Sequence, residues 1–330
     1  AKLKINEFTD KVNADIQTLK TNVAKANGND ASWTRVKDEY DKAQIAFNEA
    51  TAEVLEKMPV DGNYKDWNEK VLTDMQAAWK ILSDAWKTVK DDKALVTAEK
   101  ETELVDIIQT QKTAIVDVKT TYINKYNTVE ANKKNADTAI ATLNANLTTA
   151  TENADVKNDF KTVIDGINGN IAALENKVKA DYTAVGHPIE TADYSATITS
   201  IQNKIDQLAA DAAPVIENFN INNEFLAALG SDTGLQKEFN DAKTAVGALK
   251  PAVEEDVYDV AAKFGVTASG LQTTIDLLAK DVKAKYDARQ LSATTRVALD
   301  ARVDAAKTAI AKYQKDAEDA VARFDVVSAA

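Results

Sequence analysis

The sequence predicts an all-α protein, an elongated array of antiparallel amphipathic helix bundles of the three-helix or spectrin-like kind, with about ten to twelve helices. Apolar residues recur alternately three and four positions apart, which places them on one stripe of a helix. Only 10 Gly and 4 Pro occur in 330 residues, and a fold rich in tight turns needs more of both. No five-residue stretch rich in Val, Ile or Thr alternates between apolar and polar residues as a strand would.

Three stripes predict a three-helix bundle over residues 1–90. The first stripe consists of Ile5, Phe8, Val12, Ile16, Leu19 and Val23. The polar run Asn27-Gly28-Asn29 predicts a helix C-cap and a turn after it. The second stripe spans 33–54 and the third spans 67–89, with Pro and Gly between them.

The range 91–186 is predicted to form a bundle of long helices. Its stripes cover 104–129, 140–147 and 156–182. Because the first two stripes are separated without any Gly or Pro, the polar run Ala131–Asn135 is the predicted turn between them.

The last region, 187–330, follows Gly186-His187-Pro188, which is the clearest break in the pattern. The segment 214–265 holds most of the remaining Gly and Pro and has shorter apolar runs, so it predicts an irregular stretch of three short helices. Long stripes over 271–286 and 299–324 predict two further helices.

Composition narrows the possible partners and the location. A net charge of −12 and a pI near 4.8 disfavour nucleic acid and anionic membranes as partners. No stretch approaches the ~20 apolar residues that a membrane span needs, so no membrane insertion is expected. The absence of Cys is typical of bacterial surface and secreted proteins, which favours an extracellular location. A start at Ala1 without Met is expected for a mature or trimmed form.

The residue supply argues against an enzyme. His187 is the only His, and with no Cys the nucleophile–His and His-rich metal schemes lack their residues. We expect His187 to be a solvated turn residue. The acidic runs Asp91-Asp92 and Glu254-Glu255-Asp256 lack the register of a calcium loop and are expected to be helix-terminal charges. The predictions are therefore no catalytic residues, no metal site and no cofactor.

The candidate ligand-binding residues are four aromatics near the third stripe: Tyr64, Trp67, Trp79 and Trp86. Trp79 and Trp86 are seven residues apart and share a helix face, whereas Trp67 lies about a third of a turn away around the helix. Such rings form either a ledge for a protein or glycan partner or a wide core against a neighbouring helix or domain.

Several predicted helices open alike, with a polar or acidic residue and an aromatic before the stripe, which either internal repetition or capping chemistry alone explains. The openings that carry a resemblance are Ala31-Ser32-Trp33 with Tyr40 and Ala43, and Asp193-Tyr194-Ser195 with Ile201 and Leu208-Ala209-Ala210. They resemble the FIVAR-type and related three-helix modules of bacterial cell-surface proteins. That resemblance implies a spacer or adhesive role and assigns no binding residues.

The resulting functional expectation is a non-enzymatic bacterial cell-surface or secreted helical module that acts as an adhesin, a stalk or a scaffold and binds a protein or a glycan. The alternative is an intracellular or phage structural protein that self-assembles through coiled-coil-like helix faces. The oligomeric state stays open.

Overall fold

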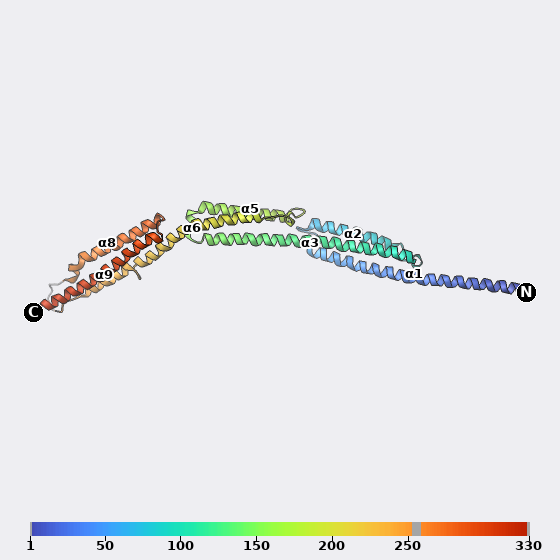
Figure 1. Cartoon of the computed structure of the whole chain (residues 1–330), viewed down its shortest axis with the longest axis horizontal. Coiled ribbons are helices and arrows are strands. Elements are labelled where there is room, and N and C mark those ends of the chain that lie inside the picture. The colour runs from blue at the N-terminus through green and yellow to red at the C-terminus, as the bar shows by residue number, and fades with distance from the viewer. Residues whose placement is uncertain (1, 253–258, 329–330) are drawn as a thin grey trace. The chain divides into compact units, whose positions relative to one another are not determined.

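The computed structural model describes residues 2–252 and 259–328, and for side chains residues 9–252 and 259–327. The chain is 87% helical and the described residues contain no strand, which confirms the predicted all-α class (Figure 1). Nine α-helices and two short 3-10 helices lie in these ranges, slightly fewer than the ten to twelve predicted.

The helices run in the following order. They are α1 (Lys2–Lys57), α2 (Lys65–Lys87), η1 (Lys93–Leu95), α3 (Ala98–Ala150), α4 (Ala154–Asp159), α5 (Lys161–Thr183), η2 (Pro188–Glu190), α6 (Ser195–Leu229), α7 (Leu235–Ala248), α8 (Val260–Asp287) and α9 (Ala293–Ser328).

The count is lower because two predicted turns are wrong. Asn27-Gly28-Asn29 lies inside α1 and Ala131–Asn135 lies inside α3, and both helices continue without a break. Neither run contains Pro, so every residue can still donate its helical hydrogen bond. One asparagine of each run, Asn29 and Asn132, bonds to a loop that is distant in the sequence.

The irregular segment predicted over 214–265 also needs correction. Helix α6 continues through Pro214, which lies inside it, and ends at Leu229. Pro214 is exposed, so water can hydrate the carbonyl that loses its helical partner. The rest of the described segment holds α7, a loop and the start of α8. The acidic run Glu254-Glu255-Asp256 lies outside the described residues.

Packing divides the chain into two compact units. Unit 1 comprises Ala1–Ala141 with Ala172–Thr197, and unit 2 comprises Thr142–Ile171 with Ile198–Ala330. The three domains predicted from sequence, 1–90, 91–186 and 187–330, follow loops rather than packing, so the two descriptions differ. The three-domain division stays a prediction.

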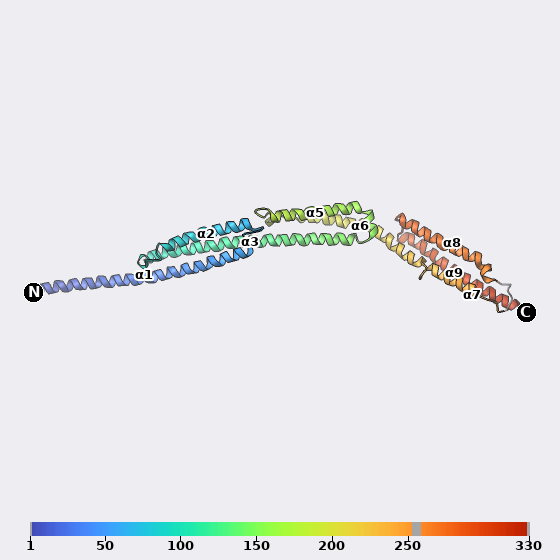
Figure 2. The same ribbon diagram turned by 180° about the vertical axis from the view of Figure 1, so that it is seen from behind.

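In unit 1, α1, α2 and the first part of α3 form a three-helix bundle, and Figures 1 and 2 both show the three helices side by side. Its core contains Val36, Ala43, Leu82, Leu104 and Ile108, all almost fully buried. Ion pairs join α1 to α3, from Arg35 to Glu101 and from Glu53 to Lys119. From the first pair to the second, the residue numbers increase in both helices, so α1 and α3 run parallel. Helix α2 runs antiparallel to both.

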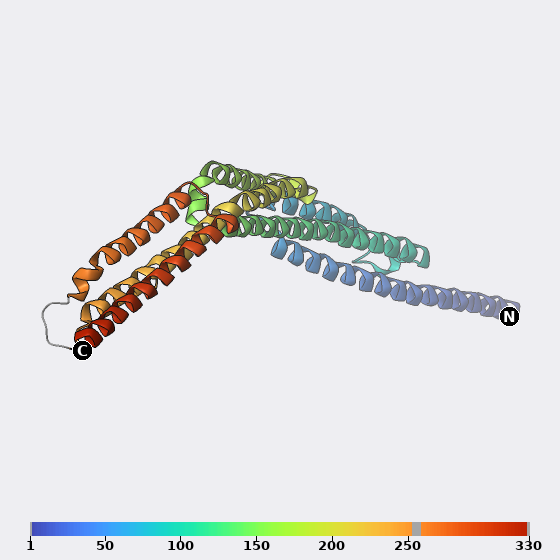
Figure 3. The ribbon, with the colours of Figure 1, turned by 60° about the vertical axis from the view of Figure 1, so that its left-hand side comes forward.

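In unit 2, α7, α8 and α9 contact one another, and the end of α6 joins their core. Figure 3 draws these helices from a turned view. Their shared core includes Phe225, Phe239, Leu271, Leu278 and Ile310. The apolar stripes of these helices are buried because removing apolar surface from water stabilises the folded chain by about 25 cal/mol per Å².

Three long helices each carry an asparagine, near the middle of the helix, that bonds to a distant loop. In α1, Asn29 Nδ2 donates to the carbonyl of Ala94 at 2.9 Å, and in α3, Asn132 Nδ2 donates to that of Ile189 at 2.9 Å. In α6, Asn218 Nδ2 donates to Tyr286 O at 3.1 Å.

Asn218 Oδ1 also accepts from Leu291 N at 2.9 Å. The three loops, 88–97, 184–194 and 288–292, bury the aliphatic side chains Val96, Ile189 and Leu291 respectively, and the first loop also buries Val89. The same asparagine-to-loop arrangement therefore occurs three times along the chain.

Candidate binding surface

Five aromatic rings interleave along the seam between α1 and α2, and we call this set the aromatic ladder. Trp33, Tyr40 and Phe47 stand seven residues apart on α1, and Trp79 and Trp86 stand seven apart on α2. Seven residues make two helical turns, so each set projects from one face. In an antiparallel pair, each α2 ring then fits between two α1 rings.

The ring contacts follow this alternation without a gap. The centroid distances are 5.5 Å for Trp33–Trp86, 5.1 Å for Trp86–Tyr40, 5.5 Å for Tyr40–Trp79 and 5.0 Å for Trp79–Phe47. Tilted and offset-stacked pairs at such distances are favourable beyond their buried area.

All five rings are half-buried, while the side chains beneath them are fully buried. Val36, Ala43 and Leu82 complete the core under the ladder, and the rings pack against its edge. One end of the ladder is fixed by polar contacts. Trp33 Nε1 donates to Val89 O at 3.0 Å, and Lys93 Nζ lies 4.8 Å from the centre of the Trp33 ring.

The four residues predicted as a site divide between two places. Trp79 and Trp86 share a face and lie in the ladder. Tyr64 and Trp67 lie in a separate cluster, where each is only 6% exposed. The structure adds Trp33, Tyr40 and Phe47, which the sequence interpretation missed although they repeat the seven-residue spacing on the preceding helix.

The second cluster surrounds His187, and we call it the histidine junction. The prediction of a solvated turn residue is wrong, because the His187 side chain is 0% exposed. Its ring centre lies 4.6 Å from those of both Tyr64 and Trp67. The residue adopts a left-handed backbone with φ of 46°, which directs the chain into η2.

The bonds of His187 define its proton positions. Nδ1 lies 2.8 Å from the carbonyl oxygen of Tyr182, and because a carbonyl only accepts, Nδ1 carries the proton and donates it. Nε2 has no hydrogen-bond partner and lies 3.6 Å from Asp66 Oδ1. Asp66 Oδ2 accepts the backbone N–H of Gly186 at 3.0 Å.

Glu130 ties the tyrosines of this junction together. Its Oε1 accepts the hydroxyl protons of Tyr64 and Tyr182, the latter at 2.8 Å. Burial, reinforced by the Glu130 carboxylate, raises the pKa of Tyr64 well above its usual range. Since Tyr64 and Trp67 are buried and engaged with neighbours, they are poorer ligand candidates than Trp79 and Trp86.

Unit 2 contains a junction of similar design around Arg289, the other non-glycine residue with a left-handed backbone among those described. Its guanidinium pairs with Asp155 at 2.8 Å and with Asp159 at 2.9 Å. Tyr286 OH donates to Asp155 at 2.5 Å, and this bond raises the pKa of the Tyr286 hydroxyl. Both junctions thus place a basic residue of one loop near an acid at the start of another helix, Asp66 of α2 in the first and Asp155 of α4 in the second.

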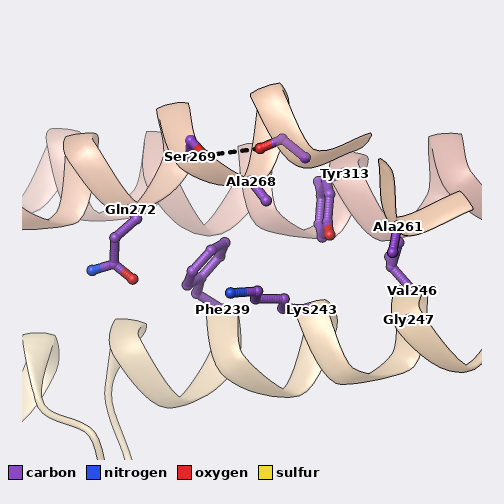
Figure 4. A pocket seen from close by; sticks show the side chains of 10 residues that line it. Phe239, Lys243, Val246, Gly247, Ala261, Ala268, Ser269, Gln272 and Tyr313 are labelled. Carbon is purple, nitrogen blue, oxygen red and sulfur yellow. Dashed lines mark hydrogen bonds between the residues drawn. The ribbon is translucent and has the colours of Figure 1, made fainter. Parts of the chain in front are cut away.

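A groove of about 550 Å³ lies between α7 and α8, and Tyr313 of α9 lines it as well (Figure 4). Lys243 is the one charged residue among its lining residues. Ser269 Oγ donates to the carbonyl of Gly265 at 2.9 Å, so this hydroxyl is used within its own helix. Burial raises the pKa of Tyr313. The lining offers apolar surface and one ammonium group, without a paired acid and base.

Among the described side chains, residues 9–252 and 259–327, no set of three or more His, Asp or Glu is grouped as metal ligands would be. None of the helices in these ranges combines the length and apolar character that a bilayer span requires. Comparison with protein-family models, curated proteins and solved structures finds no match. The resemblance to FIVAR-type modules therefore stays a prediction.

Proposed function

We propose that this chain is a non-enzymatic helical module of a bacterial cell-surface or secreted protein, acting as an adhesin, a stalk or a scaffold. The aromatic ladder is the surface that binds its protein or glycan partner. The observation that supports this proposal is the row of five half-buried rings over a core that is already complete.

The ladder suits recognition because its rings are rigid and amphipathic. Trp and Tyr dominate the binding energy of many interfaces, and a ring that is already packed on one side loses little freedom when a partner covers the other. Ladder rings on one helix repeat every seven residues, about 10.5 Å at 1.5 Å per residue. A partner with flat apolar faces at a similar repeat, such as a chain of sugar rings, matches that spacing.

The competing explanation is that the ladder only holds α1 against α2. The two explanations differ in what happens when a ring is replaced by an aliphatic side chain that still covers the core. Trp79→Leu and Trp86→Leu keep that cover and remove the ring. The matched control is Phe264→Leu, since Phe264 is a half-buried aromatic in unit 2, away from the ladder.

The test applies the chain to a printed glycan array and to immobilised extracellular-matrix glycoproteins, with binding measured by surface plasmon resonance. We expect the ladder variants to weaken binding by about tenfold or more, as for hot-spot residues, with an unchanged circular dichroism spectrum. The control should bind as the unaltered chain does. Binding that survives both ladder substitutions, or no binding to either surface, would refute the role of the ladder.

A structural protein that self-assembles is the second candidate, and one observation favours it. Val12, Ile16, Leu19 and Val23 form an apolar stripe on α1, and they are 38%, 43%, 62% and 51% exposed. Sedimentation velocity over roughly a hundredfold range of concentration tests this candidate, because assembly follows mass action. A constant monomer mass would remove it.

A further inference from the structure

The stripe on α1 belongs to a stretch that no other described helix of unit 1 covers. Every residue from 9 to 28 is exposed, and we call this stretch the arm. Figures 1 and 2 both show the arm extending beyond α2 and α3, with no other part of unit 1 alongside. Four aliphatic side chains on one face of an otherwise polar helix are typical of a surface that another element covers.

The register of the arm matches that of a buried helix segment elsewhere in the chain. Val12, Ile16, Leu19 and Val23 precede Asn29 by 17, 13, 10 and 6 residues. In α6, Ile201, Ile205, Leu208 and Ala212 precede Asn218 by the same 17, 13, 10 and 6 residues. These four α6 residues are at most 2% exposed.

The two asparagines from which these positions are counted, Asn29 and Asn218, make similar hydrogen bonds. Asn29 donates from inside α1 to a carbonyl of the loop between α2 and α3, and Asn218 donates from inside α6 to the last turn of α8 and accepts from Leu291 N in the loop between α8 and α9. Asn132 in α3 likewise donates to a loop carbonyl. Ile115 precedes Asn132 by 17 residues and is fully buried, and Tyr122 and Tyr126 occupy the positions 10 and 6 residues before it.

In α3 and α6, the part before the asparagine packs in one bundle and the part after it packs in the next. Within unit 2, the first part of α6 lies beside the end of α3 and the start of α5, and Asn146 Nδ2 of α3 donates to Gln202 Oε1 of α6 at 2.9 Å (Figures 1 and 2). Helix α1 has the second half of this arrangement, since residues after Asn29 pack against α2 and α3. The first half of α1, which contains the arm, has no such partners among the described residues of unit 1.

We infer that the arm is the third helix of a further three-helix bundle, and that a pair of antiparallel amphipathic helices preceding Ala1 in the same polypeptide covers its apolar stripe. The occupant is a helix pair because the face of identical register on α6 is covered by two helices. This inference is independent of the role of the aromatic ladder.

A second copy of the chain fits the arm less well. The helices that lie second in each bundle, α2, α5 and α8, already bury their own stripes, so the long exposed stripe that the described residues of a second copy offer is that of its arm. Two arms would form a two-helix contact, which would leave the stripe partly exposed to solvent. The four equivalent residues of α6 are fully buried. A short helix pair with few apolar residues is also marginal in water.

The test compares the 330-residue chain with a polypeptide extended upstream by about 70 residues of its natural coding sequence, long enough for two helices and a turn. Hydrogen–deuterium exchange is read over residues 9–28. We expect fast exchange in the 330-residue chain and exchange slowed about a hundredfold in the extended one, because packing protects backbone amides. Leu19→Asp should abolish that protection, whereas Thr21→Asp, on the opposite face of the arm, should not.

Three outcomes would overturn the inference. The first is an upstream reading frame that codes for no pair of amphipathic helices. The second is an arm that exchanges as fast in the extended chain as in the 330-residue chain. Alternatively, the 330-residue chain forms a dimer in sedimentation velocity whose arm is protected and whose dimerisation Leu19→Asp prevents, so that a second copy is the occupant.

Discussion

Glu101 shows how a single carboxylate joins two parallel helices of the first bundle. Both of its oxygens accept from the Arg35 guanidinium, with Nη2 to Oε2 at 2.6 Å. The buried hydroxyl of Ser32 lies beside the pair. The Arg35 bonds, helped by Ser32, lower the pKa of Glu101 to about 2 from an ordinary value of 4.5.

This shift predicts a pH-dependent contribution to stability. A carboxyl with a lowered pKa in the folded state stabilises the fold above its unfolded pKa, and the contribution is lost as pH falls from 4.5 towards 2. Glu101→Gln should therefore lower the melting temperature at pH 7, and the difference from the unaltered chain should shrink as pH falls below 4.5 and vanish below about pH 2. Glu103→Gln, which alters an exposed carboxylate two residues away, is the control. A difference that is the same at every pH would contradict the assignment.

His187 marks the limit of inference from sequence at this scale. Its place beside Pro188 suggested a solvated turn, since nothing local shows that Tyr64 and Trp67 close over the ring. The residues that bury it come from more than 100 positions away along the chain. A long-range environment of this kind leaves no periodic signal, whereas Leu82 or Ile310 can be assigned to a core from spacing alone.

At the scale of elements, helix existence was predictable and helix ends were not. The stripes predicted every long helix because burial requires their spacing. Asn27-Gly28-Asn29 and Ala131–Asn135 misled because polar residues are typical of turns and also of helix positions that bond to a distant loop, as Asn29 and Asn132 do. The face shared by Trp79 and Trp86 was predictable, whereas their partners on α1 depend on which helices pair, which a single sequence does not reveal.

Pro214 gives a prediction at this scale. It lacks the N–H that would bond to the carbonyl of Ala210, and its ring crowds that carbonyl. Because the site is exposed and helical on both sides, Pro214→Ala should restore the bond and stabilise the chain by about 1–3 kcal/mol. Urea denaturation followed by circular dichroism measures the change. Pro188→Ala, at the first turn of η2 where proline is favourable, should give no gain.

At the scale of the whole molecule, each unit has its own core, and this predicts which unit a core substitution destabilises. Leu278 in unit 2 and Leu104 in unit 1 are both 1% exposed. Leu278→Ala should cost about 2–5 kcal/mol through lost burial and a cavity. We expect amide exchange to accelerate over 260–321 far more than over 29–130, and Leu104→Ala should reverse the pattern. Equal acceleration of both ranges in either variant would mean that the cores do not act separately.

The boundary between the units cuts through α3, α5 and α6 rather than through a loop. No stretch of slack polypeptide therefore joins the units in the described residues. If the chain were pulled by its ends, as a tether under shear would be, the tension would pass from one unit to the other through helical backbone hydrogen bonds. Extension at this boundary would require unwinding those helices, because no unstructured linker is there to be drawn out first.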